Sequence, residues 1–316
     1  MSGQSVVGLE ARPPRAIHAV SVNSDDPYFE FLRARAGKIF YCLPYPGNAG
    51  DSLIQFATEA CLSNLGIETT LDPRAADIIL VPGGNPGGWP DIGIDHWQIL
   101  WRRYPHAEFV VGPAGLCTDR ANWAQVINTL GTRVTGLFAR DPASFEALHS
   151  AGLRKDITIA LSHDPALSLR GSQWLRSHRA AATEEYVLAA FRDDREAAQS
   201  CTSVFGIPRR LVSGRVYNWH VKRTASRVRD QKLARAEASV TGAMTLRKED
   251  VSRHRFEVFV EIIRAAREVH TDRLHVALLA AMLGKKVHAY QTAHDKLERV
   301  YRHSLASWAD VELVRM

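Results

Sequence analysis

Apolar runs and segments of helical periodicity alternate along most of the chain. Residues 38–43 have the aromatic and branched content of a buried strand, and residues 52–65 place apolar side chains at helical spacing. Further strands are expected at 77–81, 108–111, 134–139 and 157–161, with helices at 94–103, 120–130 and 142–150. Strands separated by helices predict a parallel sheet that is covered by helices on both faces.

A second series of the same kind follows a polar, basic stretch without apolar period at 168–183. Strands are expected at 186–191, 268–270 and 287–290, and helices at 255–266, 274–283 and 295–305. Two α/β domains suit a chain of 316 residues. The expected divisions are a leader at 1–36, an N-terminal domain at 37–170, a linker at 171–184, a C-terminal domain at 185–292 and a helical tail at 293–316.

Composition supports a globular protein and excludes several classes. With 46% hydrophobic and 23% charged residues, the chain is neither disordered nor fibrous. Its four cysteines are far apart, so the sequence indicates neither a disulfide framework nor a cysteine-based metal site. The first residues have no apolar core of signal-peptide length and no stretch approaches a membrane span, so we expect a cytoplasmic protein.

The charge balance is basic, with 40 Lys and Arg residues against 34 Asp and Glu and a formal net charge of +6. Such a balance suits an acidic substrate, an anionic membrane surface or nucleic acid. Basic side chains are dense at 208–235, with Tyr217 and Trp219 among them. This segment is either a solvated basic helix or a surface that binds a diphosphate or anionic lipid headgroups at the membrane periphery.

The helix expected at 274–283 carries the strongest indication of a site. Residues 276–283 are all apolar, so this helix has no wet face and must be buried against a sheet. Arg273 and His275 lie at its start, where unpaired N–H groups and the helix dipole favour an anion. A histidine that only caps a core helix is the simpler alternative. Residues two apart do not share a helix face, so the anion pocket requires Arg273 to belong to the preceding loop.

Glycine-rich and polar clusters follow the strands of the first domain. The loop Gly47-Asn48-Ala49-Gly50-Asp51 is neither a dinucleotide fingerprint nor a P-loop. Asp51 either caps the following helix or binds and deprotonates a sugar hydroxyl. Asn85 lies in a second glycine-rich loop, and His163 and Asp164 end the last strand. Ligands of parallel sheets bind beyond the carboxyl ends of the strands, where all of these residues fall.

Arginines also end the first strand of the second domain. Arg192 and Arg195 follow it, and we expect at least one of them to face the ligand. Together with Arg273 and His275 they would bind a small anion with several charges.

Taken in order, these segments resemble the polysaccharide pyruvyl transferase family. The resemblance rests on Gly47-Asn48-Ala49-Gly50-Asp51, Gly83-Gly84-Asn85, Arg140-Asp141 with Ser144, Asp164-Pro165-Ala166, and Thr271-Asp272-Arg273-Leu274-His275. It implies an α/β fold with two Rossmann-like domains facing across a cleft, as in GT-B glycosyltransferases. It also implies transfer of the carboxyethylidene group of phosphoenolpyruvate to two hydroxyls of a sugar, as a cyclic ketal, in exopolysaccharide or capsule biosynthesis.

The resemblance assigns roles to residues at matching positions. Arg273 and His275 match the Arg-x-His of the family, and Arg192, with Arg195 as the near alternative, matches an arginine at a strand end. His275 is the expected general acid, and the arginines hold the donor. The residues expected to orient the acceptor are Asp51, Asn48, Gly50, Asn85, His163 and Asp164.

The expected partners follow from the same resemblance. They are phosphoenolpyruvate and a sugar or a lipid-diphosphate-linked oligosaccharide, whereas no cofactor, metal or nucleic acid is needed, and a homo-oligomer is left open. The alternative enzyme is a GT-B glycosyltransferase whose cationic cluster binds a nucleotide sugar. An alternative of another class is a basic, non-catalytic module that binds nucleic acid or polysaccharide, whose activity would survive a change of His275 to alanine.

Overall fold

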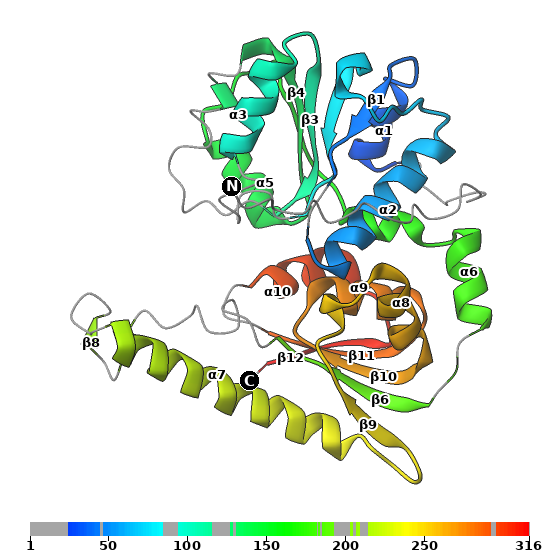
Figure 1. Ribbon diagram of the computed structural model, residues 1–316, viewed down its shortest axis with the longest axis vertical. Helices are drawn as coiled ribbons and strands as arrows, with labels where there is room; N and C mark the ends of the chain where they lie inside the picture. The colour runs from blue at the N-terminus through cyan, green and yellow to red at the C-terminus, as the bar shows by residue number, and fades with distance from the viewer. Residues whose placement is uncertain are drawn as a thin grey trace, which may run out of the picture.

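The computed structural model describes residues 25–44, 47–84, 94–115, 127–128, 131–181, 183, 185–192, 203–204, 207–208, 214–291 and 295–315. These residues form two α/β domains, each built on a parallel sheet of five strands (Figure 1). The prediction of two Rossmann-like domains is therefore confirmed.

The N-terminal sheet runs in chain order through β1 (Phe40–Cys42), β2 (Ile78–Val81), β3 (Glu108–Ala114), β4 (Val134–Ala139) and β5 (Thr158–Leu161). One face is covered by α1 (Pro27–Arg33) and α2 (Ala49–Asn64). The other is covered by α3 (Ile94–Arg103) and α5 (Pro142–Ser150). Because β2 to β4 are buried on both faces, they read as nearly continuous apolar runs in the sequence.

The C-terminal sheet has the order β12 (Val311–Val314), β11 (Lys286–Tyr290), β10 (Ala266–Thr271), β6 (Tyr186–Ala190) and β9 (Thr245–Lys248). One face packs against α8 (Phe256–Ala265) and α9 (Leu274–Met282), and the end of α7 (Gly214–Ala238) packs on the opposite face. The remaining elements are α6 (Gln173–Ala180), α10 (Lys296–Val300), a π-helical turn (Tyr301–Leu305), the short antiparallel pair β7 (Ser203–Val204) and β8 (Ile207–Pro208), and 3₁₀ turns at Pro73–Ala75, Gly131–Arg133, Pro165–Leu169 and Val251–Arg253.

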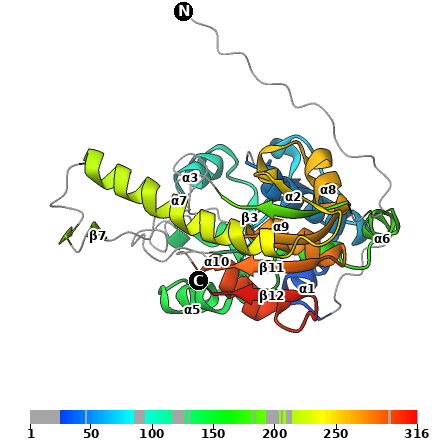
Figure 2. The same ribbon diagram turned by 90° about the horizontal axis from the view of Figure 1, so that it is seen from below.

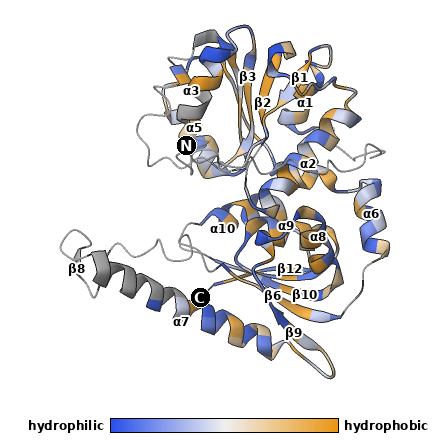
Figure 3. Cartoon of the chain, viewed as in Figure 1, coloured by the Kyte–Doolittle hydropathy of each residue, from blue (hydrophilic) through white to orange (hydrophobic). Residues whose placement is uncertain are grey.

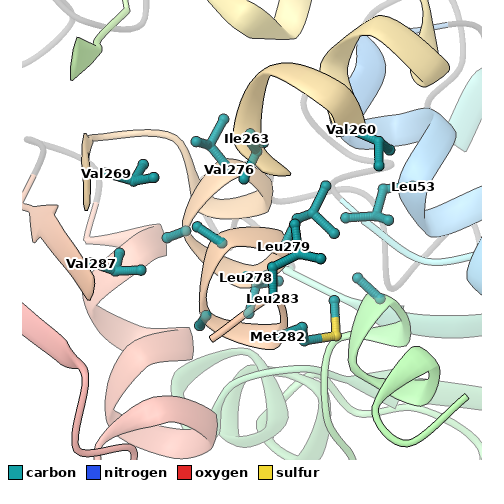
Figure 4. Close-up of a cluster of buried hydrophobic side chains, with 14 of the residues drawn as sticks. Leu53, Val260, Ile263, Val269, Val276, Leu278, Leu279, Met282, Leu283 and Val287 are labelled. Atoms are coloured by element: carbon teal, nitrogen blue, oxygen red, sulfur yellow. The ribbon is translucent and has the colours of Figure 1, made fainter. Parts of the chain in front are cut away.

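Helix α9 lies between the two sheets, and it is mostly hydrophobic (Figure 3). Every residue from Val276 to Met282 is buried, as its apolar sequence predicts. Its side chains join those of α8 and Leu53 from α2 (Figure 4). Phe56 from α2 belongs to the same cluster. One hydrophobic cluster therefore spans both domains.

Helix α7 extends away from the body of the second domain (Figure 2). It is anchored near its end, where Lys232 and Ala236 are buried. The ammonium of Lys232 forms a buried ion pair with Asp272, at 2.7 Å. Exposed arginines, Arg227 and Arg229 among them, precede this anchor.

Several elements differ from the sequence-based prediction. Helix α2 begins at Ala49 rather than residue 52, because Asn48 caps it. The polar stretch at 168–183, expected as a linker, contains α6, which Ser172 caps. The tail at 293–316, expected to be helical, also contributes β12, which pairs with β11. The helix expected at 120–130 lies outside the described residues except for residues 127–128.

Candidate functional site

Hydrogen bonds hold the loop at Gly47 and Asn48 against the first turn of α2. The Gly50 amide donates to Oδ1 of Asn48 at 2.8 Å, and the Asn48 amide donates to Oδ2 of Asp51 at 2.9 Å. This reciprocal arrangement is a capping box. A Cβ at Gly47 would lie 2.1 Å from Oδ2 of Asp51, so a larger residue there would displace the Asp51 side chain. Asn48 and Asp51 thus shape the helix terminus, and a role for Asp51 towards a substrate is a prediction.

Arg273 belongs to the loop that precedes α9, as the anion pocket requires. Its backbone is extended, and its amide donates to Oγ1 of Thr271 at 3.0 Å. The buried guanidinium pairs with Asp250, with 2.5 Å between Nη2 and Oδ2. Asp250 precedes the 3₁₀ turn Val251–Arg253, which packs against α2. Arg273 is therefore held next to a turn that contacts the N-terminal domain.

His275 lies against the first turn of α2. A Cβ added at Gly50 would be 2.6 Å from Nδ1 of His275 and 2.9 Å from its Cβ. On its other side, Nε2 lies 3.6 Å from Oδ2 of Asp164. Nε2 is buried and has no hydrogen-bond partner among the described residues. The N-termini of α2 and α9 meet at this imidazole, and both dipoles favour an anion there.

Asp164 is the buried anion of this group. Its Oδ2 accepts from Nη1 of Arg140 at 2.7 Å, and its Oδ1 accepts from the Ala166 amide at 3.1 Å. Burial acts to raise the pKa of this carboxyl, but interactions with His275 and then Arg140 outweigh it and hold the pKa at about 2. The charged carboxylate thus binds Arg140 directly and lies beside the ring of His275.

Arg140 is a site residue for which the sequence alone predicts no role. A signal was present, because Arg140 directly follows β4 and Asp164 follows β5. These strands are neighbours in the sheet, so their carboxyl ends lie at the same edge. A buried arginine at that edge requires a carboxylate partner.

His163 faces the C-terminal segment rather than α2. Its Nδ1 lies 2.9 Å from Oγ of Ser304, and its ring stacks on His303 with centroids 4.7 Å apart. Burial, and then the neighbouring His163, lower the pKa of His303. Next to this pair is a cavity of about 420 Å³ with mixed polar and aromatic walls. Its lining includes His163, Asp164, Arg170, Ser304 and Trp308.

The loop after β6 is fixed to the start of α9. The amide of Arg192 donates to Oδ1 of Asp272 at 2.8 Å, and Oδ2 of the same carboxylate pairs with Lys232. The half-buried Arg192 is therefore anchored through the residue that precedes Arg273. Arg195 and Asn85, also predicted as site residues, lie outside the described residues.

The fold and this meeting of two helix termini define a two-domain α/β protein with Rossmann-like domains. The model of the polysaccharide pyruvyl transferase family matches residues 21–294, and the chain belongs to this family. The family description implies a transferase and a polysaccharide acceptor.

Comparison with solved structures gives distant likenesses. A functionally uncharacterized protein from Klebsiella pneumoniae has 20% identity and a TM-score of 0.57, with 91% of this chain and 96% of that chain covered. A UDP-GlcNAc 2-epimerase from Methanocaldococcus jannaschii has 10% identity and a TM-score of 0.40, with 88% of each chain covered. Anabaena HepE, solved with UDP and glucose, has 12% identity and a TM-score of 0.37, with 80% of each chain covered.

No curated protein matches the chain in sequence. Within the described part of the chain, every helix is too short or too polar to cross a membrane.

Proposed function

We propose that the protein transfers the carboxyethylidene group of phosphoenolpyruvate to two hydroxyls of a sugar, forming a pyruvate ketal. The observation that carries this proposal is the position of His275. Its ring comes from the C-terminal domain and lies between the first turn of α2 and the buried Asp164, both of the N-terminal domain. Family membership supports the same reaction class.

The donor is a compact anion with a carboxylate and a phosphate on three carbons. Arg273 is the proposed main ligand because a guanidinium can bind such groups in a bidentate manner. Arg192, with Arg195 as the near alternative, is proposed as the second ligand. Asp250 holds the guanidinium of Arg273 in place through a buried ion pair.

The proposed reaction begins with protonation of the donor methylene carbon. His275 gives the proton, which leaves a cationic C2 that a sugar hydroxyl captures. The C2–O bond to phosphate then breaks, the neighbouring hydroxyl closes the ketal, and inorganic phosphate leaves. Of the two hydroxyl protons, one restores the proton that His275 gave to the new methyl group, and the other leaves with the inorganic phosphate. Arg192 and Arg273 stabilise the departing charge.

The acceptor is proposed to approach from the N-terminal domain. Asp51, Asn48, Gly50 and Asn85 come from its two glycine-rich loops, and His163 and Asp164 from the end of β5. Asp51 would accept the proton of the attacking hydroxyl.

A polysaccharide or its lipid-diphosphate-linked precursor, in exopolysaccharide or capsule synthesis, is the proposed acceptor. The exposed arginines of α7 suit anionic headgroups, which supports the proposal that the enzyme works in the cytoplasm at the inner face of the membrane.

The proposal is tested first with the purified chain. Calorimetry with phosphoenolpyruvate, and separately with UDP-glucose and UDP-GlcNAc, distinguishes ketal transfer from a nucleotide-sugar glycosyltransferase. We expect binding of phosphoenolpyruvate alone. Binding of the nucleotide sugars alone would overturn the proposal.

Catalysis is tested with His275→Gln. This variant should retain phosphoenolpyruvate binding but lose phosphate release in the presence of a glycolipid extract from host cells that lack the protein. Mass spectrometry of the host polysaccharide should show that the pyruvate ketal disappears with the protein. A ketal that persists in those cells would contradict the proposal.

A further inference from the structure

The C-terminal sheet gathers polar side chains on the face opposite α9. Val269 and Val287 belong to the cluster around α9. Alternation along the strands therefore turns Glu268, His270 and His288 to the other face. His270 and His288 are direct partners across the parallel pair of β10 and β11. Two imidazoles and a carboxylate thus lie together on a largely buried surface.

Both imidazoles approach the same carboxylate oxygen. Oε1 of Glu268 lies 2.9 Å from Nε2 of His270 and 2.9 Å from Nε2 of His288. The ligand atoms of the three residues all lie within 4.8 Å of one another. Nε2 of His288 is buried but aligned with no hydrogen-bond acceptor among the described residues. Hydrogen bonding alone therefore leaves this nitrogen unsatisfied.

The second nitrogen of each ring faces an oxygen. Nδ1 of His270 lies 2.9 Å from the hydroxyl of Tyr290, and Nδ1 of His288 lies 3.0 Å from Oε2 of Glu312. Metal-bound histidines commonly donate their second ring N–H to such an oxygen, which fixes the ring and its tautomer. Both rings are thus held with Nε2 directed towards Glu268.

We propose that Glu268, His270 and His288 bind a divalent cation of the zinc class. Two imidazoles and one carboxylate are typical ligands of zinc and related first-row metals, whereas Mg²⁺ and Ca²⁺ prefer oxygen ligands. Bonds of about 2.0–2.2 Å place tetrahedral ligands roughly 3.3 Å apart. The observed spacings of 2.9 Å need only a small outward shift to admit the ion.

Charged side chains at the edge of the cluster, Lys286 and Glu312, determine from which side a cation can enter. Lys286 opposes a cation, since its Nζ lies 3.3 Å from Oε2 of Glu268, but its side chain is 60% exposed and can turn into solvent. Glu312, whose side chain is 67% exposed, adds negative charge at the outer edge. Ser239 also hydrogen-bonds to Glu268. An ion would therefore enter from the side of Glu312.

The ion would act on the second domain rather than in the transfer reaction. It would join β10 to β11 three residues before Arg273. Metal binding to the folded state alone raises stability by mass action. The site is therefore testable without substrate or activity.

The test uses the full chain without a polyhistidine tag, stripped of metal by a chelator. Zn²⁺ is added, and bound metal is measured after gel filtration by mass spectrometry together with the melting temperature. We expect one equivalent of Zn²⁺ per chain and a higher melting temperature. Co²⁺ should give the intense visible absorption of a tetrahedral site. No stoichiometric binding, or an equal effect of Mg²⁺, would overturn the proposal.

Variants locate the site. His288→Gln and Glu268→Gln should each weaken Zn²⁺ binding at least tenfold, while the exposed His106→Gln should leave it unchanged. Glu312→Gln at the exposed rim keeps the three ligands and should weaken binding about tenfold, which covers the case in which a core variant fails to fold. Wild-type affinity in folded His288→Gln or Glu268→Gln, or in Glu312→Gln, would refute the assignment.

Discussion

Nε2 of His275 lies 3.6 Å from Oδ2 of Asp164, and the two residues come from different domains. His275 stands in the first turn of α9, and Asp164 is the third residue after the end of β5. The contact places this ring beside a carboxylate whose pKa is lowered by His275 itself and then by Arg140. Changes on either side of this contact should therefore alter both stability and the proposed chemistry.

A methyl group at Gly50 should displace the ring of His275. In Gly50→Ala the new Cβ would lie 2.6 Å from Nδ1 of His275, so either the imidazole ring or helix α2 must move. We expect a loss of about 1–3 kcal/mol in the free energy of unfolding, the usual cost of overpacking. Urea denaturation measures this loss, and NMR of the imidazole should show a shifted signal. Gly37→Ala is the control, since nothing lies within 4 Å of its Cβ, and equal effects of both changes would contradict the contact.

Removal of the Arg273 guanidinium should weaken donor binding. Charged hydrogen bonds contribute about 1.5–3 kcal/mol, so Arg273→Met should raise the dissociation constant of phosphoenolpyruvate roughly tenfold or more. Calorimetry measures this constant. Arg253→Met is the matched control, because Arg253 pairs with the same Asp250 but its side chain is 61% exposed. Unchanged binding in Arg273→Met would remove Arg273 from the donor site.

Neutralising Asp164 should leave Arg140 as an uncompensated buried charge. Asp164→Asn is expected to lower the free energy of unfolding by about 3–5 kcal/mol, measured in urea. The double variant Arg140→Met with Asp164→Asn should recover part of the loss. Asp156→Asn breaks an exposed pair with Arg154 and should have no measurable effect. If the double variant is no more stable than Asp164→Asn, the unpaired charge of Arg140 is not the cause of the destabilisation.

The pKa of Asp164 also predicts an acid limit to stability. Its folded value of about 2 lies below the ordinary 3.8. The carboxylate therefore contributes stability that is fully present above about pH 4 and is lost as the pH falls towards 2, about 2 kcal/mol in all. The free energy of unfolding, measured at several pH values between 2 and 4, should depend less on pH in Asp164→Asn than in the wild type. The same pH dependence in the variant and the wild type would contradict the lowered pKa of Asp164.

Loss of the buried ammonium of Lys232 should release the end of α7. Lys232→Met leaves Asp272 with the Arg192 amide but without its counter-ion. We expect a destabilisation of about 3–5 kcal/mol. Hydrogen exchange should become faster in α7 and at the start of α9. Arg229→Met, on the exposed part of the same helix, should change neither, and a similar response to both would refute the anchor.

The sequence predicts the α/β class and most elements because the signals are local. Periodicity over 52–65 and the unbroken apolar run of 276–282 specify α2 and α9. Strand β12 was missed because its four residues have no neighbouring pattern, and only pairing with β11 makes them a strand. Helix α6 was missed because its buried side is narrow, with only Leu175 fully buried.

The site was predictable where it depends on one segment and not where it depends on pairing. Arg273 and His275 follow from the start of an apolar helix, because a helix terminus is a local feature. The partners Asp250 and Arg140 are set by how strand ends and turns meet in space, at sequence separations of 23 and 24 residues. Asp51 shows the limit of spacing arguments, since its carboxylate completes a capping box within its own turn.

Helix α2 is connected within the first domain, yet Leu53 and Phe56 lie in the cluster built around α9. Pulling the domains apart would transfer this apolar surface to water, so a wide hinge movement is energetically unfavourable. The two halves should melt as one cooperative unit, with a single calorimetric peak. A fragment that ends at residue 170 would then expose the apolar side of α2 and aggregate, rather than fold as an independent domain.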